Sequence, residues 1–170
     1  MPPAVHFDPS RLDLNRVVAD RAEILRVNPQ RFEMEQLSAI VLIDQEQQLI
    51  AGYKDVRADE FWVRGHMPNY PLMPGVLMCE AAAQLCAFYM DSAKLKLGDF
   101  IGFGGMENVR FRGTVKPGDR LVLVAKAKDL RPRRCIFDVQ GFVGSIMVFH
   151  ADIIGVPLMR RSDAETGAEV

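Results

Sequence analysis

The sequence predicts an α+β protein in which a curved antiparallel β-sheet wraps around one long buried central helix. From residue 76 to residue 90, every residue is apolar or small except Glu80 and Gln84, so this helix has no polar face to turn to water. Segments with strand character lie on both sides of it in the chain. A single helix between strands that pair in sequence order predicts a sheet folded around that helix.

The other elements follow in chain order. Residues 10–27 alternate charged and aliphatic side chains, a spacing that fits either a short amphipathic helix or an edge segment. We expect a helical turn over residues 32–37 with Phe32 and Leu37 facing inward, and a strand buried on both faces over residues 39–43. Further strands are expected at 49–56, 100–112, 120–128, 135–143 and 146–156, with a turn at Pro117-Gly118-Asp119. This organisation divides the chain into an N-terminal extension (1–28), one domain (29–158) and a polar C-terminal tail (159–170).

Composition excludes several classes of function. The chain has 170 residues, 49% of them hydrophobic and 25% charged, which is typical of one globular domain. Its net charge of −1 predicts no general attraction to nucleic acid or to an acidic membrane. Residues 1–28 have neither the basic start nor the apolar core of a signal peptide, and no segment is long enough to span a membrane. Cys79, Cys86 and Cys135 form no disulfide framework, so we expect three buried thiols and a cytoplasmic location.

A stiff loop before the central helix carries the chemistry. Residues 64–75 contain three prolines and two glycines, and they hold His66, the natural base near neutral pH. The helix that follows brings a carboxyl group, Glu80, into apolar surroundings, where it is poised to act as a general acid. We expect the free N–H groups of Gly75, Val76 and Leu77 to face the loop, aided by the helix dipole. Base, acid and backbone donors together suit proton abstraction beside a carbonyl with departure of a β-hydroxyl group.

These residues form a long motif that resembles a known family. The motif is Gly65-His66-x-Pro68-x-x-Pro71-x-Met73-Pro74-Gly75-Val76-Leu77-x-x-Glu80-Ala81-x-Ala83-Gln84. It resembles, without a gap, the active-site signature of the β-hydroxyacyl-acyl-carrier-protein dehydratases of the FabZ type, which have the hotdog fold. The resemblance extends over residues 29–156: Pro29-Gln30-Arg31-Phe32 is similar to the family's opening motif, with Gln30 where histidine is usual, and residues 106–112 and 115–119 are similar to its third strand and turn.

The resemblance implies a role for each residue of the site. His66 is the implied catalytic base and Glu80 the acid, with each site of a homodimer taking one of the two from each protomer; a trimer of dimers is the other assembly it allows. The amides of Gly75 and Val76 are implied to polarise the thioester carbonyl, while the Leu72 carbonyl holds His66 and Gln84 steadies Glu80. The acid at position 80 is glutamate rather than aspartate, which favours the simple dehydratase over the related dehydratase that also isomerises its product.

The implied reaction is the reversible dehydration of a (3R)-3-hydroxyacyl thioester to a trans-2-enoyl thioester in fatty-acid biosynthesis. The substrate is carried on the phosphopantetheine of acyl carrier protein or coenzyme A, and no other cofactor is implied. Residues 1–28 are expected to pack on the surface of the dimer.

Two departures from the family pattern affect the acyl channel. Phenylalanine usually follows the catalytic histidine, where this chain has Met67, and a glycine-plus-polar pair is usual where it has Asn69 and Tyr70. Met67 and Tyr70 are therefore candidate residues of the acyl channel. The acyl chain length that the protein prefers stays open because of these two departures.

Charged and metal-binding candidates are few. The basic segment of Arg131, Arg133 and Arg134 is either a solvated turn or, with Arg110 and Arg112, a docking surface for the carrier, because arginine forks match phosphate. His150 lies in an apolar strand and is expected to be structural. No histidine has acidic or cysteine partners at ligand spacing, so we expect no metal site.

Two other functions use the same features. A hotdog thioesterase would hydrolyse the thioester and release a free thiol. A non-catalytic protein that binds acyl thioesters would use the same tunnel without turnover. The retained pair of His66 and Glu80 favours the dehydratase.

Overall fold

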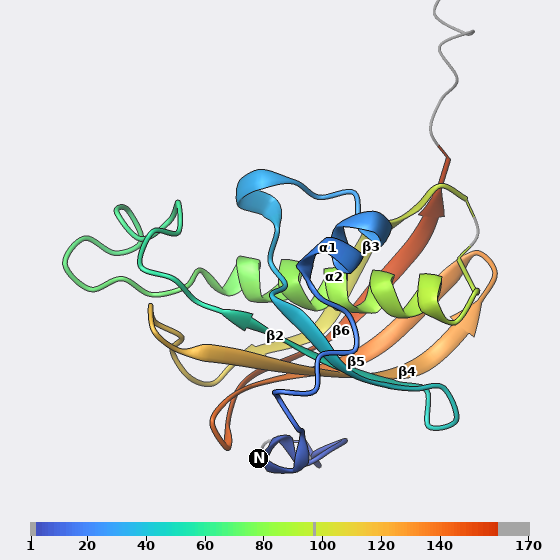
Figure 1. The fold of residues 1–170 in the computed structure, drawn as a ribbon, viewed down its shortest axis with the longest axis horizontal. Coiled ribbons are helices and arrows are strands. Elements are labelled where there is room, and N and C mark those ends of the chain that lie inside the picture. Colours follow the sequence, from blue (N-terminus) through green and yellow to red (C-terminus); the bar gives the residue numbers. More distant parts are fainter. Residues whose placement is uncertain (1–2, 97, 160–170) are drawn as a thin grey trace, which may run out of the picture.

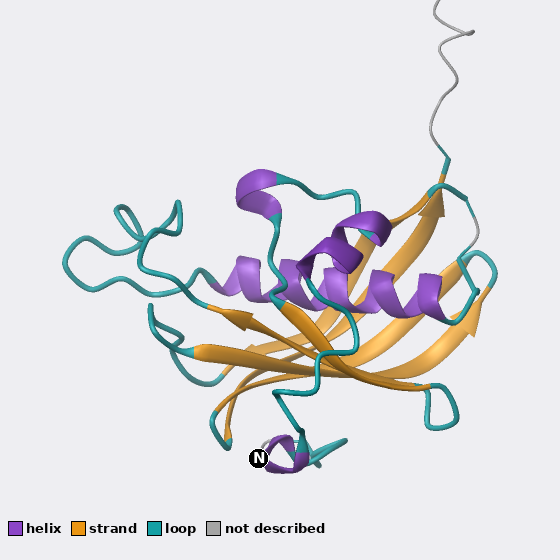
Figure 2. Cartoon of the chain, viewed as in Figure 1, coloured by secondary structure: helices purple, strands orange, loops and turns teal. Residues whose placement is uncertain are grey.

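A six-stranded antiparallel sheet curves around one long helix, as the computed structural model of the chain shows (Figures 1 and 2). The structure describes residues 3–96 and 98–159. The central helix is α2 (Gly75–Ser92), and it lies in the concave face of the sheet. Two short 3-10 turns (Pro9–Arg11 and Phe32–Met34) and helix α1 (Arg21–Val27) precede it. The strands are β1 (Ala39–Asp44), β2 (Leu49–Asp55), β3 (Phe100–Phe111), β4 (Arg120–Arg131), β5 (Arg134–Val143) and β6 (Ile146–Leu158).

The strand order is β1-β2-β4-β5-β6-β3, so β1 and β3 are the two edges of the sheet. Consecutive strands β4, β5 and β6 pair as a meander, whereas β2 reaches β4 after the chain has formed α2 and β3. This is the hotdog fold that the sequence predicts. Edge strand β3 is irregular, with register shifts between Phe103 and Gly105 and between Glu107 and Arg110.

Alternation along the strands separates two apolar layers. In β4, Leu121, Leu123 and Ala125 join the core around α2, while Val122 and Val124 face the outer side of the sheet. Because successive side chains of a strand point to opposite faces, one strand contributes to both layers. The prediction that residues 39–43 are buried on both faces holds for the first half of β1, where Ile40 faces α2 and Val41 faces outward.

The N-terminal segment provides the cover for the outer face. Phe7, Leu12 and Leu14 pack against the outer layer, so the part of this face formed mainly by β1, β2 and β4 is covered. The chain then passes the β1 edge, where Ala19 forms a bridge to Ile40, and α1 lies beside α2 on the other face (Figure 1). Both alternatives for residues 10–27 are therefore realised, an edge segment followed by a short amphipathic helix.

The central helix and each strand expected from the sequence are present, with ends within three residues of the prediction. The helix begins one residue earlier and ends two later than expected, and β4 extends to Arg131. The prediction that Phe32 faces inward is wrong: its side chain is 84% exposed, whereas Leu37 is buried as expected. The Phe32 backbone lies in the left-handed region at φ 59°, which turns the side chain away from the core. The polar tail lies outside the described residues apart from Met159.

No helix within the described part of the chain is both long enough and apolar enough to cross a membrane. Cys79, Cys86 and Cys135 are buried free thiols, as predicted, and burial raises the pKa of each.

Candidate active site

The loop that carries His66 projects beyond the N-terminus of α2 (Figure 1). It is tied internally by two contacts between the same residues: the Leu72 N–H donates to the His66 carbonyl at 2.9 Å, and His66 Nδ1 lies 2.8 Å from the Leu72 carbonyl oxygen. A carbonyl oxygen can only accept, so Nδ1 carries a proton. In the neutral imidazole, Nε2 is then the unprotonated nitrogen, which is the form that a base requires.

Two further contacts attach this loop to the body of the protein. The His66 N–H donates to the carbonyl of the buried Trp62 at 2.8 Å, and the Met73 N–H donates to the Val115 carbonyl at 2.8 Å. Met67 and Tyr70, the predicted channel residues, close a turn at the tip of the loop, where both side chains are exposed. The small cavity beside Glu80 in this chain is lined by other residues, mainly from α2, β3 and β6.

Glu80 lies on α2, half-buried, and is held by amide donors. Gln84 Nε2 donates to Glu80 Oε1 at 2.8 Å, which places the two side chains on one helix face as their spacing predicts. Gln30 Nε2 donates to the same oxygen at 3.3 Å. Among the described residues, no hydrogen bond or ion pair joins His66 to Glu80 within one chain.

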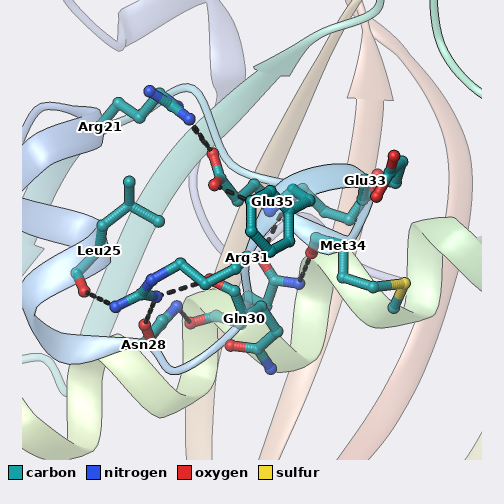
Figure 3. A network of polar contacts seen from close by, with 11 residues as sticks. Arg21, Leu25, Asn28, Gln30, Arg31, Glu33, Met34 and Glu35 are labelled. Atoms are coloured by element: carbon teal, nitrogen blue, oxygen red, sulfur yellow. Dashed lines mark hydrogen bonds and ion pairs between the residues drawn. The ribbon is translucent and has the colours of Figure 1, made fainter.

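Residues 28–36 form a loop that holds this face of α2, and we call it the clamp loop (Figure 3). Gln84 Nε2 also donates to the Met34 carbonyl at 2.7 Å, and Gln84 Oε1 accepts from the Gln36 N–H at 3.0 Å. Asn28 Nδ2 donates to the Gln84 carbonyl at 3.0 Å. Three residues of the clamp loop therefore bond to one buried glutamine of the helix.

The first turn of α2 differs in part from expectation. The Leu77 N–H donates to the Pro74 carbonyl at 2.9 Å, so the prediction that it is free is wrong; the first helical turn closes on Pro74. The N–H groups of Gly75 and Val76 precede the first intrahelical bond and remain as donors. The glycine also has a packing reason, because a Cβ at position 75 would lie 2.6 Å from the ring of Phe111.

Helix α2 is not buried all round, contrary to prediction. Val76 is 66% exposed, and Glu80, Ala83 and Ala87 are only partly covered. Their spacing of three or four residues makes them one stripe along the helix. This stripe (76, 80, 83, 87) includes Glu80 and is only partly covered in a single chain.

A family model described as a FabA-like domain matches residues 28–152. This stretch spans most of the chain and includes His66, Glu80 and both elements that hold them. The chain belongs to the FabA-like family.

Two curated relatives illustrate the place of this FabA-like protein in its family. The 3-hydroxyacyl-[acyl-carrier-protein] dehydratase FabZ of Clostridioides difficile is 33% identical over 132 residues, covering 78% of this chain and 92% of the relative. The FabZ of Rhizobium etli is 34% identical over 146 residues, covering 86% and 93%. They confirm the FabZ-type resemblance on which the site prediction rests.

Solved structures show the same fold at low identity. A chain of the dehydratase heterocomplex ApeI:P from Xenorhabdus doucetiae superposes with a TM-score of 0.65 at 13% identity, covering 84% of this chain and 93% of that one. The Escherichia coli PaaI protein from the phenylacetic acid degradation operon gives a TM-score of 0.55 at 15% identity, covering 69% and 80%.

The five arginines considered for carrier docking divide into two groups. Arg110 and Arg112 lie at the end of β3, next to the Phe111 ring that contacts the first turn of α2. Arg131 lines a surface hollow with Met90 near the other end of α2, a helix of 18 residues that is roughly 27 Å long. Arg133 and Arg134 belong to the same tight turn as Arg131, and both Arg131 and Arg134 bind Asp129. One chain therefore does not bring the five together.

Other titratable groups have structural partners. His150 Nδ1 accepts from Arg112 Nε at 3.4 Å, and burial, with the nearby guanidinium of Arg112, lowers the pKa of His150. In residues 3–96 and 98–159, His, Cys, Asp and Glu side chains form no group of three that could hold a metal ion.

Two contacts of the site had no clear signal in the sequence. Gln30 stood out only as a departure from the family motif, and nothing indicated that its side chain reaches Glu80, 50 residues away. Phe111 is one of several apolar residues in β3, and only the fold places its ring on Gly75.

Proposed function

We propose that this FabA-like protein catalyses the reversible dehydration of (3R)-3-hydroxyacyl thioesters to trans-2-enoyl thioesters in fatty-acid biosynthesis. The observation that carries the proposal is the set of hydrogen bonds around His66 and Glu80, which prepares one residue as a base and the other as a positioned acid. The activity named for the FabZ relatives supports the same reaction.

The base step belongs to His66 in this proposal. Nε2 takes a proton from the carbon next to the thioester carbonyl, and the electron pair of that C–H bond moves toward the carbonyl. The Leu72 carbonyl stays on Nδ1–H and stabilises the imidazolium that forms. The amides of Gly75 and Val76 stabilise the negative charge that develops on the carbonyl oxygen, with the positive end of the helix dipole behind them.

The acid step belongs to Glu80. Its proton passes to the β-hydroxyl group as the carbon–oxygen bond breaks, so water leaves and the double bond forms between the α and β carbons. Glu80 ends as a carboxylate and His66 as an imidazolium, and proton exchange with solvent restores both. Gln84 keeps Glu80 oriented throughout, since its amide is bonded on both sides.

The active site is shared between two protomers in this proposal. His66 and Glu80 have separate hydrogen-bond partners within one chain. The stripe of α2 that carries Glu80 is only partly covered, and edge strand β3 exposes Phe103, Met106 and Phe111. Exposed apolar side chains along an unpaired sheet edge mark an association surface. A second copy placed there would cover the stripe and supply His66 to it; a dimer, or a trimer of dimers, follows.

Substrates reach the site on a phosphopantetheine arm in this proposal, with acyl carrier protein as the partner in the cytoplasm. Arg110 and Arg112 lie beside His150, on the opposite face of β3 from Phe111, which favours them for contact with the acidic surface of the carrier. The group of Arg131, Arg133 and Arg134 lies at the other end of the helix and fits a separate contact with the carrier.

The test is the absorbance of an enoyl thioester, crotonyl-coenzyme A or its carrier-protein form, when the purified protein is added. We expect the conjugated-thioester band to fall as water adds across the double bond, without release of free thiol. His66→Ala and Glu80→Gln should each lower the rate by about 10²–10⁴-fold, as is typical for a general acid or base. His6→Ala, in the N-terminal segment against Asp138, is the control and should keep the full rate.

Other outcomes point to other functions. Free thiol released in proportion to the loss of the band would favour a thioesterase. Saturable binding of the thioester with no spectral change would favour a non-catalytic binding protein. Unchanged turnover in both His66→Ala and Glu80→Gln would refute the proposed roles.

A further inference from the structure

Gln30 is the one polar side chain around Glu80 that the proposed reaction leaves without a role. Its Nε2 donates to Glu80 Oε1 at 3.3 Å, and it lines a small, mostly apolar cavity together with Glu80 between α2 and the strands β3 and β6. Its Oε1 is buried and has no hydrogen-bond partner. A buried polar atom without a partner destabilises the fold, so this arrangement calls for a reason other than stability.

The backbone of Gln30 is held in place by its neighbour Arg31 (Figure 3). The Arg31 guanidinium donates to the carbonyls of Leu25 at 2.8 Å, Asn28 at 2.7 Å and Gln30 at 2.6 Å. One charged group therefore joins the last turn of α1 to the start of the clamp loop. Because Asn28 is itself bonded to the Gln84 carbonyl, the Gln30 side chain starts from a point that is fixed relative to α2.

The orientation of the Gln84 amide decides which oxygen of Glu80 accepts. Gln84 Oε1 faces the Gln36 N–H, and Gln84 Nε2 faces the Met34 carbonyl. A flipped amide would place two donors together and two acceptors together, so the observed orientation is the only one that satisfies both. Nε2 must then donate to Glu80 Oε1, and Oε1 is an acceptor whether or not Glu80 is protonated.

Gln30 adds a second N–H to the same oxygen. With two donors on Oε1, a proton on the carboxyl group belongs on Oε2, the oxygen that no described residue hydrogen-bonds. We propose that Gln30 is a positioning residue that acts with Gln84 to keep Glu80 Oε1 as the acceptor and Oε2 as the oxygen that holds and delivers the proton. This inference rests on the proposed function, in which Glu80 is the acid.

A neutral amide at position 30 has a further consequence. Glutamine does not change its charge with pH, whereas a histidine side chain titrates near neutral pH. The donors around Glu80 therefore stay the same across the pH range in which the enzyme works.

The test compares Gln30→Met with the wild type by the ¹³C NMR titration of the Glu80 carboxyl carbon, assigned with Glu80→Gln. Donors to the ionised carboxylate favour that form, so removing one should raise the midpoint of the Glu80 titration by about 0.5 pH unit. Gln30→Ala removes the same donor with a smaller side chain and should shift the midpoint in the same direction. Gln45→Met is the control: Gln45 contacts the other end of α2, through the Ser92 carbonyl, and the midpoint should not move.

Stability distinguishes positioning from a structural role. Met has nearly the length of Gln and brings no buried oxygen without a partner, so Gln30→Met should melt at the wild-type temperature or slightly above it. If Gln30→Met loses stability while the Glu80 midpoint stays in place, the role is structural and the inference is wrong. An unshifted midpoint in both Gln30 variants overturns it as well.

The NMR titration of Glu80 can be measured whether or not the protein turns over substrate. The proposed function and the role of Gln30 can therefore be refuted independently. A wild-type protein that leaves the enoyl thioester unchanged would refute the proposed function, while the midpoint still decides whether Gln30 holds Glu80. If the wild type is active, the alkaline limb of its pH–rate profile should move upward with the NMR midpoint in Gln30→Met. If the NMR midpoint of Glu80 moves in Gln30→Met but the alkaline limb of the pH–rate profile does not, Oε2 of Glu80 is not the source of the proton.

Discussion

Gln84 is only 2% exposed, yet both ends of its side-chain amide are hydrogen-bonded. It joins the clamp loop to the acid, since it bonds Met34, Gln36 and Glu80 at once. A hydrogen bond adds little net stability when it forms, but a buried group left without its partner is costly. At the scale of single residues, the order of this site depends on such complete pairing more than on charge.

Gln84→Leu should lower the free energy of unfolding by about 1–3 kcal/mol, because the buried Gln36 N–H loses its acceptor. Urea denaturation measures the change. Gln45→Leu, at an exposed glutamine, should stay within about 0.5 kcal/mol of the wild type. Equal effects of the two substitutions would contradict the role assigned to Gln84.

The pKa of His150 predicts a loss of stability in acid. Burial, and then the positive charge of Arg112, hold this pKa below its ordinary value in the folded protein. As the pH falls through the ordinary value, the unfolded chain binds a proton that the folded chain does not, so unfolding is favoured. Between pH 7.5 and 5.5, the urea midpoint of the wild type should therefore fall more than that of His150→Gln. Parallel falls in the two proteins would show that His150 does not contribute.

At the scale of elements, β3 contacts the first turn of α2, where the amides of Gly75 and Val76 lie. The Phe111 ring occupies the space where a Cβ of residue 75 would lie, and it stacks on Phe149 of β6 with 6.2 Å between ring centres. The aromatic pair therefore supports the helix N-terminus at the point where the free amides lie.

Gly75→Ala should destabilise the protein by about 1–3 kcal/mol, because its Cβ meets the Phe111 ring at 2.6 Å. Alanine is otherwise the better residue in a helix, so a loss of stability identifies the contact rather than helix propensity as the cause. Adding Phe111→Leu to Gly75→Ala should restore part of the loss, which thermal melts of both variants and of Phe111→Leu alone can measure. Effects that simply add would show that the two positions are not coupled.

At the scale of the whole molecule, three features of the single chain support the proposed site shared between protomers. The loop with His66 projects away from the sheet (Figure 1), the stripe of α2 with Glu80 is only partly covered, and the β3 edge exposes apolar side chains. A second copy of the chain that covers the stripe and the β3 edge would account for all three features.

Mixed dimers test this arrangement directly. His66→Ala and Glu80→Gln subunits are each inactive alone, but a dimer with one of each would have one site with both wild-type residues. After random exchange of equal amounts, about a quarter of the wild-type activity should return, since half of the dimers are mixed and half of their sites are intact. Subunit exchange can be followed with differently tagged chains. Activity that stays at the level of the single variants after exchange would place the whole site within one chain.

The sequence by itself determined the fold class, the central helix and the FabZ-type resemblance. Periodicity and proline content are local properties, so the buried helix, the stiff loop before it and nearly every strand could be predicted from neighbouring residues. The spacing of four residues likewise predicted that Gln84 meets Glu80. The orientation of Phe32 was missed because a single left-handed backbone angle decides it.

Only the tertiary structure decided which distant residues meet. Gln30 reaches Glu80, Phe111 fills the space beside Gly75, and the N-terminal segment covers the outer face of the sheet. The contacts of Gln30 and Phe111 join residues more than 30 positions apart, and all three depend on how the sheet curves around α2 rather than on neighbouring residues in the sequence. The partly exposed stripe of α2 has the same origin: hydrophobicity predicts that a helix is buried, whereas the arrangement of its neighbours decides which side stays partly exposed.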